Sequence, residues 1–217
     1  MKAVQPQRYP LVLRVLHWLL AALLAMQILL GFAAEHGASR AVSDALFPCH
    51  FRLGVLILVL MLLRLGLRLA LPLPADDDGT SGWRQRIRSL VHGLLYLLVL
   101  VLPISGHVIW VWMGADRTLF GQIEVPALFV PPQEDETGRA VAWYVHVYGA
   151  WTLLALAGLH AAAAMWRHWR QKDGFIRRRM GFGYMPSKSG AREAEKSAVQ
   201  GRGGACTRDG GTMDVAT

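Results

Sequence analysis

Residues 15–34 read VLHWLLAALLAMQILLGFAA and contain no Asp, Glu, Lys or Arg. A helix of about 20 apolar residues is long enough to cross the roughly 30 Å hydrocarbon layer of a membrane. Two further stretches without these charged residues follow at 89–115 and 140–166. The whole chain of 217 residues is 53% hydrophobic and only 18% charged, whereas charged residues make up roughly a quarter of a soluble protein. The composition therefore argues against a soluble enzyme.

A fourth apolar run, at 47–71, carries Arg52, Arg64 and Arg68 towards its ends, where long basic side chains can reach the headgroups. We expect residues 1–182 to form an all-α transmembrane four-helix bundle. The predicted spans are about 11–34, 47–71, 89–113 and 140–167. The first run is long for a secretory signal and its end is a loose match to a cleavage site, so we interpret it as an anchor.

The distribution of Lys and Arg predicts the orientation of the four spans. Nineteen of these residues lie on the side of the two termini and of the connection between the second and third spans, and four lie on the other side. The positive-inside rule then places both termini in the cytoplasm. The net charge of +8 is thus explained by membrane anchoring, and nucleic acid is not an expected partner. We expect an irregular outer loop at 113–142 and a disordered cytoplasmic tail at 183–217.

Eight histidines in so apolar a chain indicate a functional site, because ionisable groups are costly inside a membrane. Six of them fall into two layers by their depth in the predicted spans, while His36 lies in an outer loop and His168 at the inner boundary. The inner layer comprises His17, His92 and His160, and the outer layer comprises His50, His107 and His146.

The helix predicted at 140–167 carries one histidine of each layer on a single face. His146 and His160 are separated by fourteen residues, almost four helical turns, and so by roughly 21 Å along the axis. This helix can offer one imidazole to each of two stacked centres. Haem b suits such an arrangement, since its iron takes two axial imidazoles from facing helices and its macrocycle fills the interior of a bundle.

Other interpretations of the histidines are possible. A single membrane histidine is commonly an interhelical hydrogen-bonding group, zinc or copper would need ligands converging at one depth, and a proton relay would normally include a carboxylate. Cys49 and Cys206 supply neither a zinc framework, a redox pair nor a covalent haem motif. Haem agrees best with the residues present, although each layer has three candidates for two ligand positions. No catalytic residue is identified.

Several motifs make the chain resemble the bacterial (prokaryotic) cytochrome b561 family, whose members are four-helix di-haem b proteins of the inner (plasma) membrane. The resemblance covers about residues 8–180 and is specific in the order and spacing of its motifs. The matching residues are Tyr9-Pro10, Arg14-Val15-Leu16-His17-Trp18, His50-Phe51-Arg52-Leu53-Gly54, His92 to Tyr96, Leu102-Pro103-Ile104-Ser105-Gly106, His146, Gly158-Leu159-His160 with the four alanines after it, and Lys172-Asp173-Gly174.

The resemblance implies two non-covalent, bis-histidine haem b groups. Carried over residue by residue, His17 and His160 would bind the inner haem, and His50 and His146 the outer one. His92 would then be a non-ligand near the inner haem, beside a propionate or a quinone pocket. His107 stands where the family commonly has Trp, and is an alternative outer ligand. Phe51 stands where the family often has Lys, which weakens any role for a basic side chain there.

The function implied by the resemblance is electron transfer between an external or membrane donor and a quinone such as ubiquinone. Some members of the family oxidise superoxide, so an enzymatic role as a quinone-linked oxidoreductase and a role as a pure electron carrier both stay open. A second hypothesis is a cytochrome b subunit that anchors a hydrogenase- or dehydrogenase-type redox partner. A third, from another class, is a haem-free membrane scaffold or transporter.

Overall fold

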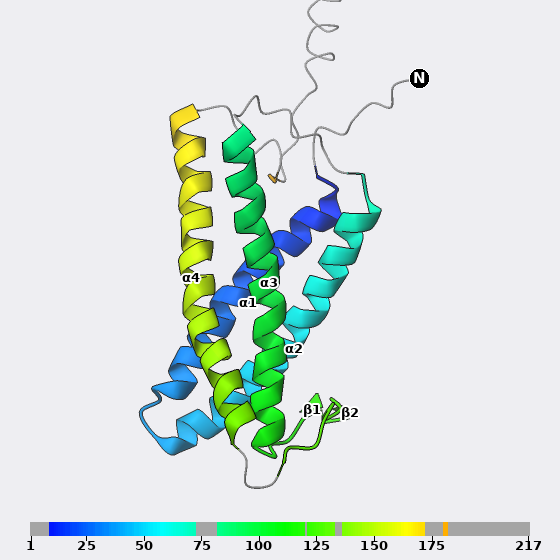
Figure 1. Ribbon diagram of the computed structural model, residues 1–217, viewed down its shortest axis with the longest axis vertical. Coiled ribbons are helices and arrows are strands. Elements are labelled where there is room, and N and C mark those ends of the chain that lie inside the picture. Colours follow the sequence, from blue (N-terminus) through cyan, green and yellow to red (C-terminus); the bar gives the residue numbers. More distant parts are fainter. Residues whose placement is uncertain (1–8, 73–81, 120, 133–135, 172–179, 182–217) are drawn as a thin grey trace, which may run out of the picture. The chain divides into compact units, whose positions relative to one another are not determined.

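The computed structural model describes residues 9–72, 82–119, 121–132, 136–171 and 180–181. Four long helices account for most of them (Figure 1): α1 (Leu11–Glu35), α2 (Arg40–Ala70), α3 (Gly82–Trp112) and α4 (Thr137–Gln171). Each is long and apolar enough to cross a membrane. The prediction of an all-α transmembrane four-helix fold is therefore confirmed. The tail predicted at 183–217 and the motif Lys172-Asp173-Gly174 lie outside the described residues.

Helix α2 begins at Arg40, earlier than the span predicted from residue 47. Ser39 has an extended backbone at the N-cap and its side chain accepts a hydrogen bond from the N–H of Val42, which satisfies one of the free donors of the first turn. The turns from Arg40 to Phe47 are thus part of the helix, although their sequence is not continuously apolar. Pro48 lies within α2 and Pro103 within α3.

The described part of the outer connection contains more structure than the irregular loop expected from the sequence. Strands β1 (Thr118–Leu119) and β2 (Ile123–Glu124) pair in antiparallel fashion, with Thr118 opposite Glu124. Gly121 between them has φ +70°, a conformation that favours glycine. In the described residues, the first part of the connection therefore contains a short antiparallel strand pair.

A glycine also ends α3. Gly114 has φ +59°, its N–H bonds to the carbonyl of Val111 at 3.1 Å, and the N–H of Ala115 bonds to that of Trp110 at 3.4 Å. These two bonds form a Schellman motif, which satisfies the last carbonyls of a helix and turns the chain away from its axis.

Close backbone contact joins α1 with α2, α3 with α4 and, less extensively, α2 with α3. The pairs α1–α4 and α2–α4 are not among these closely packed helices in the described residues. The hydrophobic core lies midway along the helices, and its buried members come from all four: Leu20, Ile57, Met61, Val99, Leu102 and Leu153.

The outward faces of the helices are apolar. Leu29, Leu69 and Leu159 are each more than 60% exposed, which in water would leave large apolar surfaces unburied. Trp166 and Trp169 are exposed near the end of α4, and the Arg170 guanidinium lies 5.1 Å from the Trp166 ring centre. Aromatic and basic residues of this kind are typical of a membrane interface.

Candidate haem-binding histidine pairs

The inner histidine layer brings together α1, α3 and α4. The ring centres of His17 and His160 are 6.4 Å apart with their planes at 86°. Those of His92 and His160 are 5.0 Å apart, also at 86°. The Nδ1 of His92 donates to the carbonyl of Arg88, one turn earlier on its own helix, at 2.7 Å. His160 therefore has two histidine neighbours, of which His92 is tied to its own helix.

The outer layer brings together α2 and α4. The ring centres of His50 and His146 are 5.9 Å apart with their planes at 76°. The Nδ1 of His50 donates to the carbonyl of Gln27 at 3.1 Å, and the Nδ1 of His146 donates to that of Leu102 at 2.9 Å. A Nδ1–H that is held by a carbonyl leaves the lone pair of Nε2 available as a metal ligand.

The separation of the rings can be compared with what an iron would need. An imidazole nitrogen bonds a metal at about 2 Å and lies about 1 Å from its ring centre, so two rings on opposite sides of one metal have centres about 6 Å apart. The His17–His160 and His50–His146 separations of 6.4 and 5.9 Å fit this requirement. The 5.0 Å between His92 and His160 is too short.

The helices that carry each histidine pair are not among the closely packed helix pairs. His17 and His160 lie on α1 and α4, and His50 and His146 lie on α2 and α4. Neither α1–α4 nor α2–α4 is among the helix pairs with extensive backbone contact in the described residues, although the imidazole rings of each histidine pair lie close together. Two rings at metal-ligating separation on helices that are not closely packed are compatible with a planar cofactor such as haem.

One contact opposes ligation in the present arrangement. The side-chain Nε2 of Gln27 lies 3.2 Å from Nε2 of His50 and 2.9 Å from the carbonyl oxygen of His50. The amide thus occupies the lone pair that an iron would need. The Oε1 of Gln27 is buried and has no hydrogen-bond partner within the described part of the chain. The side chain must rotate away before His50 can bind a metal.

His107 and His36 stack on phenylalanine rings. His107 stacks on Phe51 with ring centres 6.2 Å apart, and its buried Nε2 has no partner among the described residues. His36 stacks on Phe32 at 4.4 Å. The structure therefore brings His107 against an aromatic ring and not opposite another histidine.

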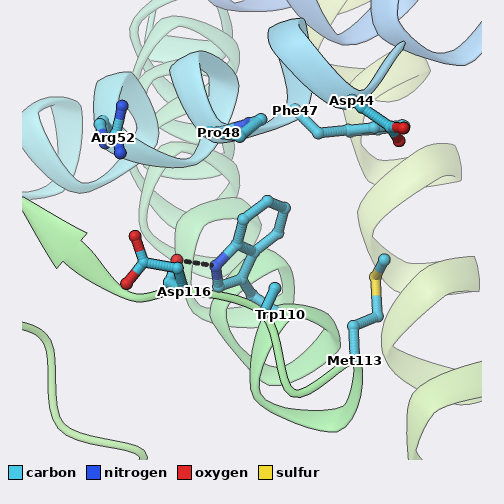
Figure 2. A pocket seen from close by; sticks show the side chains of 8 residues that line it. Asp44, Phe47, Pro48, Arg52, Trp110, Met113 and Asp116 are labelled. Atoms are coloured by element: carbon cyan, nitrogen blue, oxygen red, sulfur yellow. Dashed lines mark hydrogen bonds between the residues drawn. The ribbon is translucent and has the colours of Figure 1, made fainter. Parts of the chain in front are cut away.

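The first turns of α2, the end of α3 and the segment that leads into the hairpin line an open cavity of about 260 Å³ (Figure 2). None of the paired histidines lines it. Trp110 forms one wall and donates its indole N–H to the carbonyl of Asp116 at 2.8 Å. Phe51, which follows His50 in the sequence, stacks on Trp110 with ring centres 4.9 Å apart. The cavity is lined by Asp44, Phe47, Pro48, Arg52, Trp110, Met113, Ala115 and Asp116.

Three basic residues near the hairpin and the start of α4 contact other residues of the chain. Arg52 donates to the carbonyl of Thr118 at 3.3 Å, Arg117 pairs with Glu124 at 3.5 Å, and Arg139 pairs with Glu136. The hydroxyl and the backbone N–H of Thr118 both donate to the exposed carboxylate of Asp116. These bonds lower the pKa of Asp116, and the hydroxyl bond contributes more than the N–H bond. Among these three basic residues, Arg117 and Arg139 have their charge paired with a carboxylate, whereas Arg52 bonds a neutral carbonyl.

These features define a membrane-spanning four-helix protein with two stacked histidine pairs. A model of the prokaryotic cytochrome b561 family matches residues 8–183, and the chain belongs to this family. It is a multi-pass protein of the bacterial inner membrane, and its family binds haem b.

Two relatives come from Escherichia coli (strain K12). Cytochrome b561 homolog 2 is 32% identical over 92 residues, which is 42% of this chain and 46% of the relative. Cytochrome b561 homolog 1 is 31% identical over 98 residues, which is 45% of this chain and 53% of the relative. The chain thus spans about half the length of the curated relatives that it matches.

Proposed function

We propose that this protein conducts electrons across the inner membrane through two haem b groups, each held by two histidines. His17 and His160 are the inner ligands, and His50 and His146 the outer ones. The observation that carries the proposal is the pair of ring separations, 6.4 and 5.9 Å, which repeats between α4 and two different helices. Family membership implies the haem, and the geometry of this chain supports the number and the ligands.

When bound, each haem b supplies a reversible one-electron iron couple whose potential depends on its ligands and surroundings. The protein has three tasks towards it. It presents Nε2 of two imidazoles, it holds their Nδ1–H groups in the outer pair on backbone carbonyls, and it surrounds the sites with apolar helices. The hydrogen bonds orient the imidazoles, and the apolar helices limit the access of water and lower the local dielectric constant.

The hydrophobic core divides the two sites. Leu153 lies seven residues from each of His146 and His160 on α4 and is 3% exposed. With Leu20 and Ile57 it fills the bundle between the layers. The ligands of the two layers are separated by roughly 21 Å along α4, so an electron crosses most of the membrane by passing between the two sites.

The proposal also includes an orientation in the membrane and the partners that exchange electrons with the protein. The excess of Lys and Arg on one side of the spans supports an orientation with both termini in the cytoplasm, in which the cavity beside Trp110 faces outward. The stacked rings of Trp110 and Phe51 connect this cavity with the segment that carries His50. An external or membrane donor delivers electrons at this side, and a quinone such as ubiquinone exchanges them within the membrane. Since Arg117 and Arg139 are paired with acids, an anionic donor such as superoxide gains no strong electrostatic attraction from them.

The test is a reduced-minus-oxidised spectrum of the purified protein, with the haem content measured per chain. We expect two b-type haems. Replacement of His17 or His160 by Ala should remove one of them, and replacement of His50 or His146 the other. A wild-type protein with a single haem would contradict the proposed pairing. The absence of any reducible b-type band would reject electron transfer by haem altogether.

A further inference from the structure

The imidazoles of the outer pair lie directly against the backbone of a neighbouring helix. A Cβ atom at Gly31 of α1 would stand 2.9 Å from Cε1 and 3.2 Å from Nδ1 of His50. A Cβ atom at Gly106 of α3 would stand 2.9 Å from Cε1 and 3.3 Å from Nδ1 of His146. These separations are shorter than van der Waals contact, so either imidazole would have to move if the glycine gained a side chain.

Each of these glycines follows, by four residues, the carbonyl that accepts the Nδ1–H of the same ring. Gln27 precedes Gly31, and its carbonyl is 3.1 Å from Nδ1 of His50. Leu102 precedes Gly106, and its carbonyl is 2.9 Å from Nδ1 of His146. In an α-helix the carbonyl of residue i and the N–H of residue i+4 adjoin. One helical turn therefore provides both the space for the ring and its hydrogen-bond acceptor.

The same arrangement occurs twice, on two different helix pairs. It joins α1 to α2 at His50, and α3 to α4 at His146. In addition, the hydroxyl oxygen of Ser105 lies 3.1 Å from Nδ1 of His146. Because the outer ligands are on α2 and α4, the two glycines support opposite sides of a single proposed site.

The inner pair lacks this support. Within the described ranges, no hydrogen bond to a backbone carbonyl is found for the ring of His17 or His160. A Cβ atom at Gly93 or at Gly158 would meet nothing within 4 Å, even though these glycines lie close to His92 and His160 in the sequence. A glycine near a histidine is thus not sufficient, and the outer layer differs from the inner one in its construction.

We propose that Gly31 and Gly106 are positioning residues for the outer haem ligands. Each allows an imidazole to reach the carbonyl one turn earlier, which fixes the tautomer with a free Nε2 and increases the basicity of the ligand. This inference rests on the proposed function, because it assumes that His50 and His146 bind the same iron. A methyl group at either glycine displaces the ring and weakens its Nδ1–H bond.

The experiment compares Gly31→Ala and Gly106→Ala with Gly66→Ala and Gly93→Ala in the full-length protein. Gly66 and Gly93 are matched controls, because both lie in helices and a Cβ atom there meets nothing within 4 Å. The haem content per chain and the midpoint potential of each haem are measured. We expect a partial or complete loss of the outer haem in the first two variants, and a more positive midpoint potential for what remains of it. The controls should match the wild type.

The outcomes separate this inference from the proposed function. Retention of the inner haem, with an unchanged spectrum, shows that a variant has folded. Wild-type haem content and potentials in both Gly31→Ala and Gly106→Ala would overturn the positioning role. Simultaneous loss of both haems in both variants would also contradict it, because the glycines contact only the outer ligands. If the wild type itself binds one haem, or if His50→Ala and His146→Ala do not remove the same haem, the proposed pairing fails first.

Discussion

His17 and His160 lie on α1 and α4 with their ring centres 6.4 Å apart, which fits two ligands of one iron. His92 is nearer to His160, at 5.0 Å, and its Nδ1 is bound to the carbonyl of Arg88. His92 is therefore the histidine ring nearer to His160, but His17 is the one at ligating distance.

The first prediction separates these two partners of His160. We expect His92→Phe to keep both haems, because His92 is too close to His160 to share an iron with it, whereas His17→Phe should lose the inner haem. The haem content per chain and the low-spin ferric signals in electron paramagnetic resonance measure the difference. Loss of the inner haem in His92→Phe, with retention in His17→Phe, would exchange the two roles.

The second prediction concerns the inner end of the bundle, where Arg64 joins three helices. Its Nη1 donates to the carbonyl of Leu13 at 2.8 Å, and its Nε donates to the hydroxyl of Tyr96 at 3.4 Å. Arg64→Met should lower the free energy of unfolding by about 1–3 kcal/mol, since a charged donor is lost and a carbonyl loses its partner. Thermal unfolding in detergent measures this change.

Arg68→Met is the control for Arg64. Arg68 lies on the same helix and its guanidinium is 5.9 Å from the ring centre of Tyr96, but no hydrogen bond to Leu13 depends on it. Arg68→Met should lower the free energy of unfolding by less than Arg64→Met does, and we expect the difference to be about 1 kcal/mol or more. Equal destabilisation by the two substitutions would show that the bond to Leu13 contributes little.

The third prediction follows from the amide of Gln27, which lies 3.2 Å from Nε2 of His50. Gln27→Leu removes this competitor but keeps the backbone carbonyl that holds Nδ1. We expect the outer haem to bind up to about tenfold more tightly, the equivalent of one hydrogen bond. Titration of haem into the haem-free protein measures the affinity, with Met26→Leu at an exposed neighbouring position as the control. Weaker binding in Gln27→Leu would show that the amide assists the bound state.

The sequence alone predicts the four helices because the membrane imposes the length of each apolar run. It predicts less well where a helix continues beyond the apolar run. Ser39 extends α2 outward by capping a turn that is not apolar, and Gly114 and Gly121 shape the outer connection through positive φ values. Ser39 and the two glycines are visible signals, but each is weak without the hydrogen bonds that it makes.

The candidate site, like the fold, is predicted only in part from the sequence. The spacing of His146 and His160 predicts two layers, and the family resemblance implies the partners. The contacts that position the rings are not predictable, because Gly31 and Gly106 differ from Gly66 and Gly93 only in what another helix places beside them. The interference of Gln27 with His50 depends equally on the packing of α1 against α2.

The last prediction concerns the outer hairpin, whose start is held by Asp116. Hydrogen bonds from the hydroxyl of Thr118 and, to a smaller extent, from its N–H lower the pKa of this exposed carboxyl. Since the folded pKa lies below its ordinary value, the carboxylate supports the hairpin fully above the ordinary pKa and loses this effect as the pH falls through the lowered pKa. Thr118→Val removes the hydroxyl bond and should move the titration of Asp116 upward, so that the hairpin loosens at a higher pH. Carboxyl-carbon magnetic resonance of Asp116 and the amide signal at position 118 follow the change. Asp116→Asn, in which this titration is abolished, is the control. An unchanged pKa in Thr118→Val would show that the hydroxyl does not stabilise the carboxylate in solution.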